Sequence, residues 1–357
     1  MNDRPLVTFA LFAYNQERFI REAVAGAFSQ TYSPLEIILS DDCSPDSTFD
    51  IMREMASQYA GPHEIVLNRN QVNLGIGAHV NRVNEIARGN LIVAAAGDDV
   101  SLPNRCEELV GYWQETGCLF NVVQSDKLII DADGKEIDVP YEPLYTGTFG
   151  FGMLLNLEGI KGATQMYTRK IFTQFGPMLQ DTVVEDCVIA MRGYLLGGIG
   201  YCKKALVRYR VHGSNITSMQ TTSDDMILHD RIGFHRRFHN VYRNYQRDIM
   251  CAYSLGLIER SALHRLLDMV DPYAEMCFDK AKFLEGGNRE KVRLITKYMV
   301  KYPAQALSWI TILICPSLYV NMGKNNSLGL VTERVNRALA RFRKRWFISR
   351  KARMSSL

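Results

Sequence analysis

The chain has 357 residues, of which 47% are hydrophobic and 22% are charged, with 26 Gly and 11 Pro. This composition excludes collagen-like, low-complexity and wholly disordered chains, and the length suffices for one large domain or two smaller ones. The eight cysteines form no C-x-x-C pair, so the sequence predicts reduced thiols in a cytoplasmic protein and no zinc knuckle or disulfide framework. The net charge of +4 includes nine Lys/Arg and no Asp/Glu from Arg334 to Leu357, which leaves −5 on the body of the chain.

The first third of the chain alternates β-rich apolar runs with segments of helical period. The sequence predicts strands at Leu6–Ala13, Leu35–Ser40, Glu64–Asn68 and Leu91–Ala96. Between and after them, segments that begin near Ile20, Phe49 and Pro103 are predicted to be helical. This alternation is typical of βαβ units and a parallel sheet. Such sheets bind ligands beyond the carboxyl ends of their strands, so polar residues at those ends are the first candidates for a site.

The rest of the chain is less regular. Its patterns predict strands at Thr164–Thr168 and Ala205–Val211, a helix at Val188–Leu196 and a hairpin turn at Ala132–Lys135. After about Ser223 the pattern is helical to the end. We find no internal repeat and no Gly/Ser linker.

Acidic pairs follow two of the predicted strands. Asp41 and Asp42 end the second strand, where carboxylates can accept hydrogen bonds from a ligand or simply cap a turn and face solvent. Asp98 and Asp99 follow Gly97 at the end of the fourth strand. Two carboxylates on such a turn suit a hard cation, Mg²⁺ or Mn²⁺, that also holds phosphates, and the alternative is an ordinary turn.

A third acidic pair and a few histidines complete the candidates. Glu185 and Asp186 precede an apolar helix, where they can favour the helix dipole or supply a general base. His212 follows a predicted strand and can complete a carboxylate metal site or be an ordinary loop histidine. His235 and His239 can share a helix face, but no acidic third ligand accompanies them at helical spacing, so we do not expect a metal there.

Glycine-rich phosphate loops and nucleophile elbows are absent from the sequence. There is no G-x-x-x-x-G-K-[ST], no G-x-G-x-x-G and no G-x-S-x-G, and Gly75-Ile76-Gly77 is a lone G-x-G. If phosphates bind to this chain, a metal is expected to neutralise much of their charge.

The ordered motifs from about Leu6 to Asn215 resemble those of the family 2 glycosyltransferases, which are inverting enzymes of the GT-A fold. The motifs that carry the resemblance are Phe12–Glu17, Phe28–Tyr32, Glu36–Thr48, Asn73–Gly75, Arg88–Asn90, Gly162–Thr164, Phe175–Pro177 and Glu185–Asp186. Their order and spacing together make the resemblance specific.

The resemblance implies a set of donor-binding residues. Asp41 or Asp42 would contact the nucleobase of a nucleotide-sugar. Asn73 belongs to the stretch that leads toward the metal-binding strand and is expected on the donor side. Asp98 would face the ribose or the phosphate.

The resemblance also implies a metal site and a base. Asp99 would ligate Mn²⁺ or Mg²⁺, and His212 resembles a histidine placed near the metal in some relatives. Asp186 would be the general base. Many relatives have a further aspartate where this chain has Ala96, so the cation is expected to be held largely by the diphosphate of the donor.

The implied fold is a GT-A, Rossmann-like mixed sheet, mostly parallel and flanked by helices, with a helical carboxyl-terminal extension. We expect a catalytic domain over residues 1–222, with a nucleotide-sugar half at 1–125 and an acceptor half at 126–222. Residues 223–357 are expected to form a helical region that ends in a basic amphipathic tail at 334–353.

The implied function is inverting transfer of a sugar from a nucleoside-diphosphate donor, a UDP-sugar being favoured, to an acceptor hydroxyl. The expected acceptor is a glycan or a lipid-linked molecule in the assembly of a bacterial surface polysaccharide or glycolipid. A sugar-phosphate nucleotidyltransferase is one alternative, although Tyr14–Glu17 is not the Gly-rich, Arg-containing loop that such an enzyme carries after its first strand. A non-catalytic carbohydrate- or membrane-binding module is the other alternative.

The carboxyl-terminal segments bear on location. Residues 302–323 are uncharged, and their prolines and polar residues favour a buried or in-plane helical hairpin over a membrane span. In the tail, an apolar stripe faces a basic side, the pattern of a helix on an anionic membrane surface. The stripe consists of Val335, Leu339, Phe342 and Trp346. We therefore expect a cytoplasmic protein, peripheral on the inner face of the cell membrane, and no nucleic-acid partner, since no base-reading module is present.

Overall fold

The computed structural model describes residues 4–137, 150–157, 159–212 and 224–301. These residues divide into two compact units. The first contains residues 4–212 and 234–278, and the second contains residues 224–233 and 279–301. The sheet and the helices that cover it belong to the first unit.

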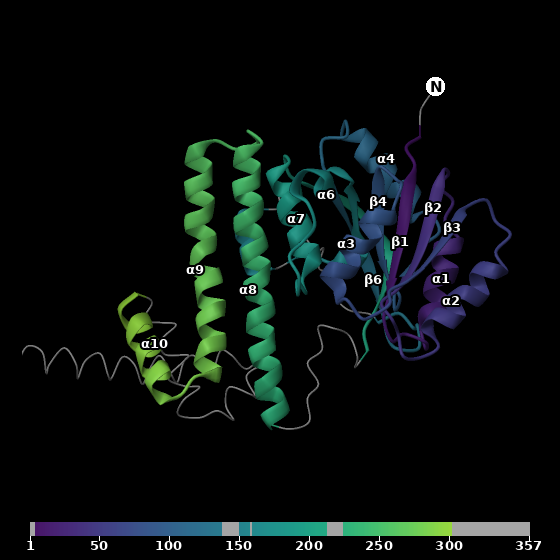
Figure 1. Cartoon of the computed structure of the whole chain (residues 1–357). Coiled ribbons are helices and arrows are strands. Elements are labelled where there is room, and N and C mark those ends of the chain that lie inside the picture. Colours follow the sequence, from purple (N-terminus) through teal and green to yellow (C-terminus); the bar gives the residue numbers. More distant parts are fainter. Residues whose placement is uncertain (1–3, 138–149, 158, 213–223, 302–357) are drawn as a thin grey trace, which may run out of the picture. The chain divides into compact units, whose positions relative to one another are not determined.

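Four parallel strands form one half of the sheet (Figure 1). They are β1 (Val7–Ala13), β2 (Leu35–Asp41), β3 (Glu64–Arg69) and β4 (Leu91–Ala96), in the spatial order β3-β2-β1-β4. Every residue of β1 and β2 is buried, as expected for strands covered by helices on both faces. The four strands predicted from the apolar runs are confirmed to within one residue at each end.

The other half of the sheet is mixed. In spatial order after β4 it contains β7 (Gln165–Thr168), β6 (Val122–Ile130), β8 (Ile199–Arg210) and β5 (Val100–Ser101). β7 is antiparallel to both β4 and β6, β5 is antiparallel to β8, and β6 is parallel to β8. The predicted fold class, a mixed and mostly parallel sheet flanked by helices, is confirmed.

The sheet is curled, as the short connection between β4 and β5 requires. Val100 lies four residues after Ala96, so their Cα atoms can be at most about 14 Å apart. In a flat sheet, the three intervening strands would separate β4 from β5 by about 19 Å. The curl therefore brings the carboxyl end of β4 close to β5 and its partner β8. The connection between β4 and β5 contains Asp98 and Asp99.

Three helices cover one face of the sheet. They are α1 (Ile20–Phe28), α2 (Thr48–Ser57) and α4 (Arg105–Glu115). Their apolar stripes bury Val24, Met52 and Leu109 in one cluster with Phe9 and Leu39 of the strands. The predicted helical segments near Ile20 and Phe49 thus supply the inner sides of these helices.

The opposite face is covered by a second set of helices. They are α3 (Ile76–Ile86), α5 (Phe151–Asn156), α6 (Lys170–Phe175) and α7 (Glu185–Leu195). Val83, Leu154 and Val188 lie fully buried in their shared core. The helix predicted at Val188–Leu196 is α7, which begins three residues earlier, at the acidic pair.

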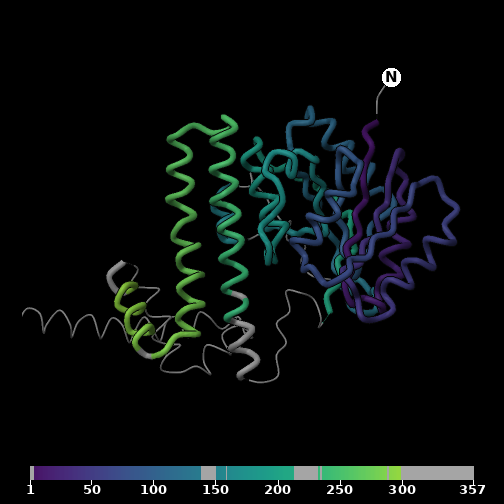
Figure 2. Tube along the Cα trace, in the orientation of Figure 1, coloured from purple at the N-terminus to yellow at the C-terminus, as the bar shows by residue number. Residues whose placement is uncertain are grey.

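Two long helices, α8 (Asp224–Ser254) and α9 (Arg260–Glu285), follow, and within the first unit they run alongside each other (Figure 2). The Tyr245 hydroxyl donates to the carbonyl oxygens of Leu154 and Cys187, so α8 packs on α5 and α7. The Arg192 and Asp248 side chains, both fully buried, form an ion pair with an N–O distance of 2.7 Å. Residues 234–278 therefore share a hydrophobic core with the sheet domain.

The expected division into a catalytic domain over 1–222 and a helical region over 223–357 stays a prediction. In the second unit, α10 (Asn288–Lys301) contacts the end of α9, where Lys297 and Tyr298 both donate to the Asp279 carboxylate. The predictions for residues 302–323 and for the tail at 334–353 concern segments outside the described residues. Among the described helices, none combines the length and the hydropathy that crossing a bilayer requires.

Candidate active site

The turn after β4 brings Asp98 together with His212, which follows β8. The Asp98 Oδ2 atom lies 3.0 Å from the Nε2 atom of His212, and the two side chains are 13% and 8% exposed. The imidazole packs on Phe19, with ring centroids 4.6 Å apart. His212 is thus adjacent to Asp98, and the metal role expected of Asp99 and His212 stays a prediction.

Asp99 is turned into the protein. Its side chain is buried, and its Oδ1 atom accepts a hydrogen bond of 2.8 Å from the backbone N–H of Arg210. Burial, and secondarily the adjacent Asp98 carboxylate, raise the pKa of Asp99 to about 8. This environment leaves Asp98 as the more accessible carboxylate of the pair.

Arg210, the last residue of β8, organises this turn. Its fully buried guanidinium donates to the carbonyl oxygens of Asp98 and Ala132 and forms an ion pair with Glu22 of α1. Ala132 belongs to the predicted hairpin turn, which is confirmed by a hydrogen bond of 3.1 Å from the Gly134 N–H to the Asp131 carbonyl. Arg210 therefore ties β8, α1 and the hairpin to the backbone of the acidic turn.

The Asp41–Asp42 pair at the end of β2 is engaged within the chain. Asp41 accepts hydrogen bonds from the backbone N–H and the hydroxyl of Ser44. Asp42 accepts from the Asn70 side chain at 2.8 Å and from the backbone N–H groups of Leu74 and Gly75 at 2.9 and 3.0 Å. Both carboxylates thus shape the loops that follow β2 and β3, which agrees with the turn-capping alternative. Their expected contact with the nucleobase of a nucleotide-sugar stays a prediction.

Asn73 lies on the same loop and is exposed. Its side-chain oxygen accepts a hydrogen bond of 2.9 Å from the Gly75 N–H, one residue before α3. Gly75 has a φ of 76°, a conformation that glycine adopts at little cost. In the structure, Asn73 makes a contact that forms a turn. Its expected part in binding the nucleotide-sugar also stays a prediction.

Asp186 lies in the first turn of α7 and is held by a short 3₁₀ helix, η1 (Gly162–Thr164). The Gly162 N–H donates to Asp186 Oδ2 at 2.9 Å. A side chain at position 162 would begin 3.1 Å from the Glu185 carboxylate and 3.2 Å from the Asp186 Cβ, so this close approach favours glycine. Burial raises the pKa of Asp186, which makes it a stronger base near neutral pH than an exposed aspartate.

The strand pairing explains how these groups converge. β7 pairs with β4 only over Leu91–Val93 and with β6 only over Val122–Gln124, whereas β4 and β6 both continue further. Beyond this pairing, η1 packs against β4, β6 and β8. The acidic turn after β4, the far half of β6 and the Asp186 support at η1 therefore lie at the same edge of the sheet, where open α/β sheets bind ligands.

The other predicted or visible sites lie elsewhere. The Nδ1–H of His239 donates to the carbonyl oxygen of Ala274 at 2.9 Å, and His235 is buried. Among the residues that the structure describes, no group of three or more His, Cys, Asp or Glu side chains is arranged to hold a metal.

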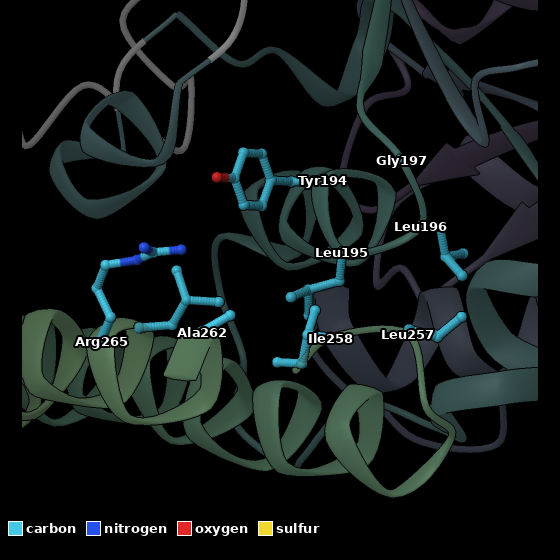
Figure 3. A pocket seen from close by; sticks show the side chains of 9 residues that line it. Tyr194, Leu195, Leu196, Gly197, Leu257, Ile258, Ala262 and Arg265 are labelled. Atoms are coloured by element: carbon cyan, nitrogen blue, oxygen red, sulfur yellow. The ribbon is translucent and has the colours of Figure 1, made fainter. Parts of the chain in front are cut away.

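A pocket of about 490 Å³ lies at the carboxyl end of α7, lined mainly by apolar side chains with Tyr194 and Arg265 (Figure 3). It is at the opposite end of α7 from Asp186.

Comparison with protein families decides the relationship. Residues 8–175 match the model described as Glycosyl transferase family 2. These residues form a family 2 glycosyltransferase domain. The resemblance recognised in the sequence motifs is confirmed.

Curated relatives of the family 2 domain include EpsE of Bacillus subtilis and an uncharacterised glycosyltransferase of Haemophilus influenzae. The chain is 34% identical to EpsE over 134 residues, 38% of this chain and 47% of EpsE. It is 26% identical to the Haemophilus protein over 234 residues, 61% of this chain and 69% of that protein. The matched stretch thus spans about half the length of EpsE.

Solved structures show the same fold as the family 2 domain and its following helices. Residues 1–349 of TarS from Staphylococcus aureus superpose with a TM-score of 0.55 at 15% identity, covering 85% of this chain and 82% of that one. The same TarS fragment in complex with UDP-GlcNAc gives a TM-score of 0.52 at 14% identity, with 84% and 87% covered. At this identity the likeness supports the GT-A-like fold.

Several residues that bear on the site were not predicted from the sequence. Arg210 is one, and Lys127 of β6 and Lys161, which precedes η1, are others. His79 of α3 is a fourth: it is buried, and its Nε2 atom lies 2.6 Å from the Ser40 hydroxyl beside Asp41 and Asp42. No sequence motif marks these residues, because each acts through contacts with distant parts of the chain.

Proposed function

We propose that this chain is an inverting glycosyltransferase that moves a sugar from a nucleoside-diphosphate donor to an acceptor hydroxyl. The observation that carries the proposal is the convergence, at one edge of the sheet, of the Asp98–His212 pair with the supported carboxylate of Asp186. The family 2 domain supports glycosyl transfer as the reaction class. The acceptor is proposed to be a glycan or a lipid-linked molecule of a bacterial surface polysaccharide or glycolipid.

The proposed reaction is a single displacement. The acceptor oxygen forms a bond to the anomeric carbon while the bond from that carbon to the diphosphate oxygen breaks, and the nucleoside diphosphate leaves. Asp186 takes the proton of the attacking hydroxyl, a contribution typically worth about 10²–10⁴-fold in rate. One carboxylate base suffices, because inversion in one step needs no covalent intermediate.

The residues at the acidic turn are suited to a divalent cation that is bound mostly by non-protein oxygens. The Asp98 carboxylate and the His212 imidazole lie 3.0 Å apart and provide one oxygen and one nitrogen donor. Mg²⁺ is commonly bound by one or two carboxylates together with substrate phosphates. We therefore propose Asp98 and His212 as the residues that would hold Mn²⁺ or Mg²⁺. Asp99 supports the turn through its hydrogen bond with the backbone N–H of Arg210.

A bound cation would neutralise charge on the departing diphosphate. The rest of the site acts through the chain itself. Arg210 keeps the Asp98 backbone in place, and Phe19 fixes the orientation of the His212 ring. Asp41, Asp42 and Asn73 shape the loops on which the nucleobase is proposed to bind.

Replacing Asp98 by Ala is expected to separate recognition of the diphosphate from recognition of the nucleoside. With Mn²⁺ present, UDP affinity should fall at least tenfold, whereas uridine affinity should change less than twofold, because only the diphosphate shares the cation with Asp98. Isothermal titration with UDP, GDP and their nucleosides, each with and without EDTA, measures both effects. UDP is the first probe because the similarly folded TarS fragment was solved with UDP-GlcNAc.

The matched control for this experiment is Asp133→Ala, which removes an exposed aspartate, 84% accessible, from the hairpin turn. Its UDP affinity should equal that of the native chain. Equal UDP binding by Asp98→Ala and native protein would reject the proposed cation site. Slow release of UDP from a UDP-sugar by the native protein would separate a transferase from the nucleotidyltransferase and from the non-catalytic module.

We further propose that the basic tail attaches the protein to the inner face of the cell membrane. In the full chain, changing Arg334, Arg337, Arg341 and Lys344 to Gln should weaken binding to anionic vesicles at least tenfold, since each charge near such a surface contributes about 1 kcal/mol. Co-sedimentation with phosphatidylglycerol-containing vesicles at low and high salt measures this.

Four exposed arginines in the first unit serve as a control with the same change in net charge. Arg18, Arg21, Arg53 and Arg82 have side chains that are 47–63% exposed. Their replacement by Gln should leave most vesicle binding intact. If both quadruple variants lose binding equally, net charge and not the tail holds the protein on the vesicles.

A further inference from the structure

Lys127 occupies an unusual position on β6. The strand is irregular at this point, because its pairing with β8 shifts register on both sides of Asp126. Immediately after the shift, Lys127 pairs with Val207 of β8, and Val207 pairs on its other side with Ser101 of β5. Two strand spacings of about 4.8 Å place the Lys127 backbone about 10 Å from β5, which directly follows the Asp98–Asp99 turn.

The face on which Lys127 lies can be read from its neighbours. Its amine is 4.2 Å from the centre of the Tyr209 ring. Tyr209 alternates along β8 with Arg210, which contacts Glu22 of α1. Because successive side chains of a strand point to opposite faces, Lys127 lies on the face away from α1, which is the face covered by α7 and its Asp186.

The surroundings of the Lys127 amine are suited to binding an anion. The side chain is half-buried, and no hydrogen bond or ion pair joins its amine to the part of the chain that the structure describes. The nearby carboxylates already accept other donors, Asp126 from the Tyr201 hydroxyl and Asp99 from the Arg210 N–H. Burial, and then the neighbouring Lys161, lower the pKa of Lys127 to about 8.

Lys161 lies on the other side of this region. Its backbone N–H points at the Gln124 side chain of β6 at 3.4 Å, and the next residue, Gly162, holds Asp186. The charge of Lys127 interacts with Asp99 in the acidic turn and with Lys161, and the charge of Lys161 interacts with Asp186. A donor whose reacting carbon faces Asp186 and whose diphosphate reaches Asp98 would therefore lie near this lysine.

From this placement we infer that Lys127 binds the diphosphate of the donor and stabilises it as a leaving group. This inference rests on the proposed function and adds a residue that supplies positive charge where the protein offers few metal ligands. When the bond between the anomeric carbon and the diphosphate oxygen breaks, negative charge grows on the diphosphate. The Lys127 ammonium stabilises this charge by donating hydrogen bonds to the phosphate oxygens. No proton transfer is required of it.

Nucleotide binding by lysine variants tests the inference. Lys127→Met is expected to lower UDP affinity at least tenfold in the presence of EDTA as well as Mn²⁺, while uridine affinity stays within twofold. Lys127→Arg should restore UDP affinity to within about threefold of the native value, because the charge returns. Lys203→Met is the matched control: Lys203 is an exposed lysine of β8, and its removal should change neither affinity.

Chemical labelling gives a readout that does not depend on how a variant folds. Reductive methylation of the native chain, followed by mass spectrometry, should show Lys127 protected by UDP but not by uridine, and Lys203 labelled equally throughout. UDP binding by Lys127→Met at native affinity, or undiminished labelling of Lys127 in saturating UDP, would overturn the inference and leave the proposed function standing. A native protein that binds neither UDP nor GDP would overturn both.

Discussion

Replacement of Asp186 by Asn should abolish glycosyl transfer while UDP affinity stays within about threefold of the native value. The amide cannot take the proton of the acceptor hydroxyl, and loss of a general base typically costs about 10²–10⁴-fold in rate. The backbone contact with Gly162 can persist through the amide oxygen, so the first turn of α7 should remain in place. Turnover with a UDP-sugar and calorimetric UDP binding are measured on the same preparation.

Glu185 is the informative comparison for this experiment. It adjoins Asp186, and burial, together with the Asp186 charge, raises its pKa to about 8. The raised pKa is shared by both carboxyls, but the Gly162 N–H positions only Asp186, so Glu185→Gln should retain more activity than Asp186→Asn. The opposite ranking, with an active Asp186→Asn protein and an inactive Glu185→Gln protein, would assign the base to Glu185.

Asp248→Asn is expected to lower the free energy of unfolding of the first unit by about 3–5 kcal/mol, the usual cost of removing one partner from a buried ion pair. Arg192 and Asp248 are both fully buried, so the guanidinium would lose its counter-charge without gaining water. Its remaining partners are the carbonyl oxygens of Ile171 and Gly176. Urea unfolding followed by circular dichroism measures the loss.

An exposed aspartate on α9 provides the control for the buried pair. Asp271 accepts a hydrogen bond from Gln246 at the surface, and Asp271→Asn should change stability by less than about 0.5 kcal/mol. The double change Arg192→Met with Asp248→Leu should recover most of the loss, because two apolar groups leave no buried charge unpaired. Equal stabilities of Asp248→Asn and native protein would show that the buried Arg192–Asp248 pair contributes little to stability.

The strands and the acidic turns were predictable because each depends on neighbours in the sequence. A fully covered parallel strand needs a continuous apolar run, and β4 follows that rule from Leu91 to Ala96. The polar residues after such a run must lie at the edge of the sheet, so Asp98 could be identified as a candidate. The position of Asp186 in the first turn of α7 was predictable in the same way, whereas its support by Gly162 comes from a contact 24 positions away in the sequence.

The pairing of the acidic groups was not predictable, because it depends on contacts between distant segments. Arg210 meets Glu22 across 188 positions of sequence, and His212 meets Asp98 across 114. Only the curl of the sheet brings these segments together. The first half of β8 was missed for a different reason, since Lys203 and Lys204 interrupt its apolar run and conceal a strand that extends to Ile199.

The packing of α8 on α7 has a consequence for protein engineering. A hybrid of two relatives can be made by joining their chains at a domain boundary, and the sequence pattern suggests a junction near residue 222. Because Tyr242 and Tyr245 donate to backbone carbonyl oxygens of α5 and α7, a hybrid joined there would set foreign helices against a native core. A junction beyond residue 278 keeps that core from a single parent, and hybrids made there should yield more folded protein than hybrids joined at 222.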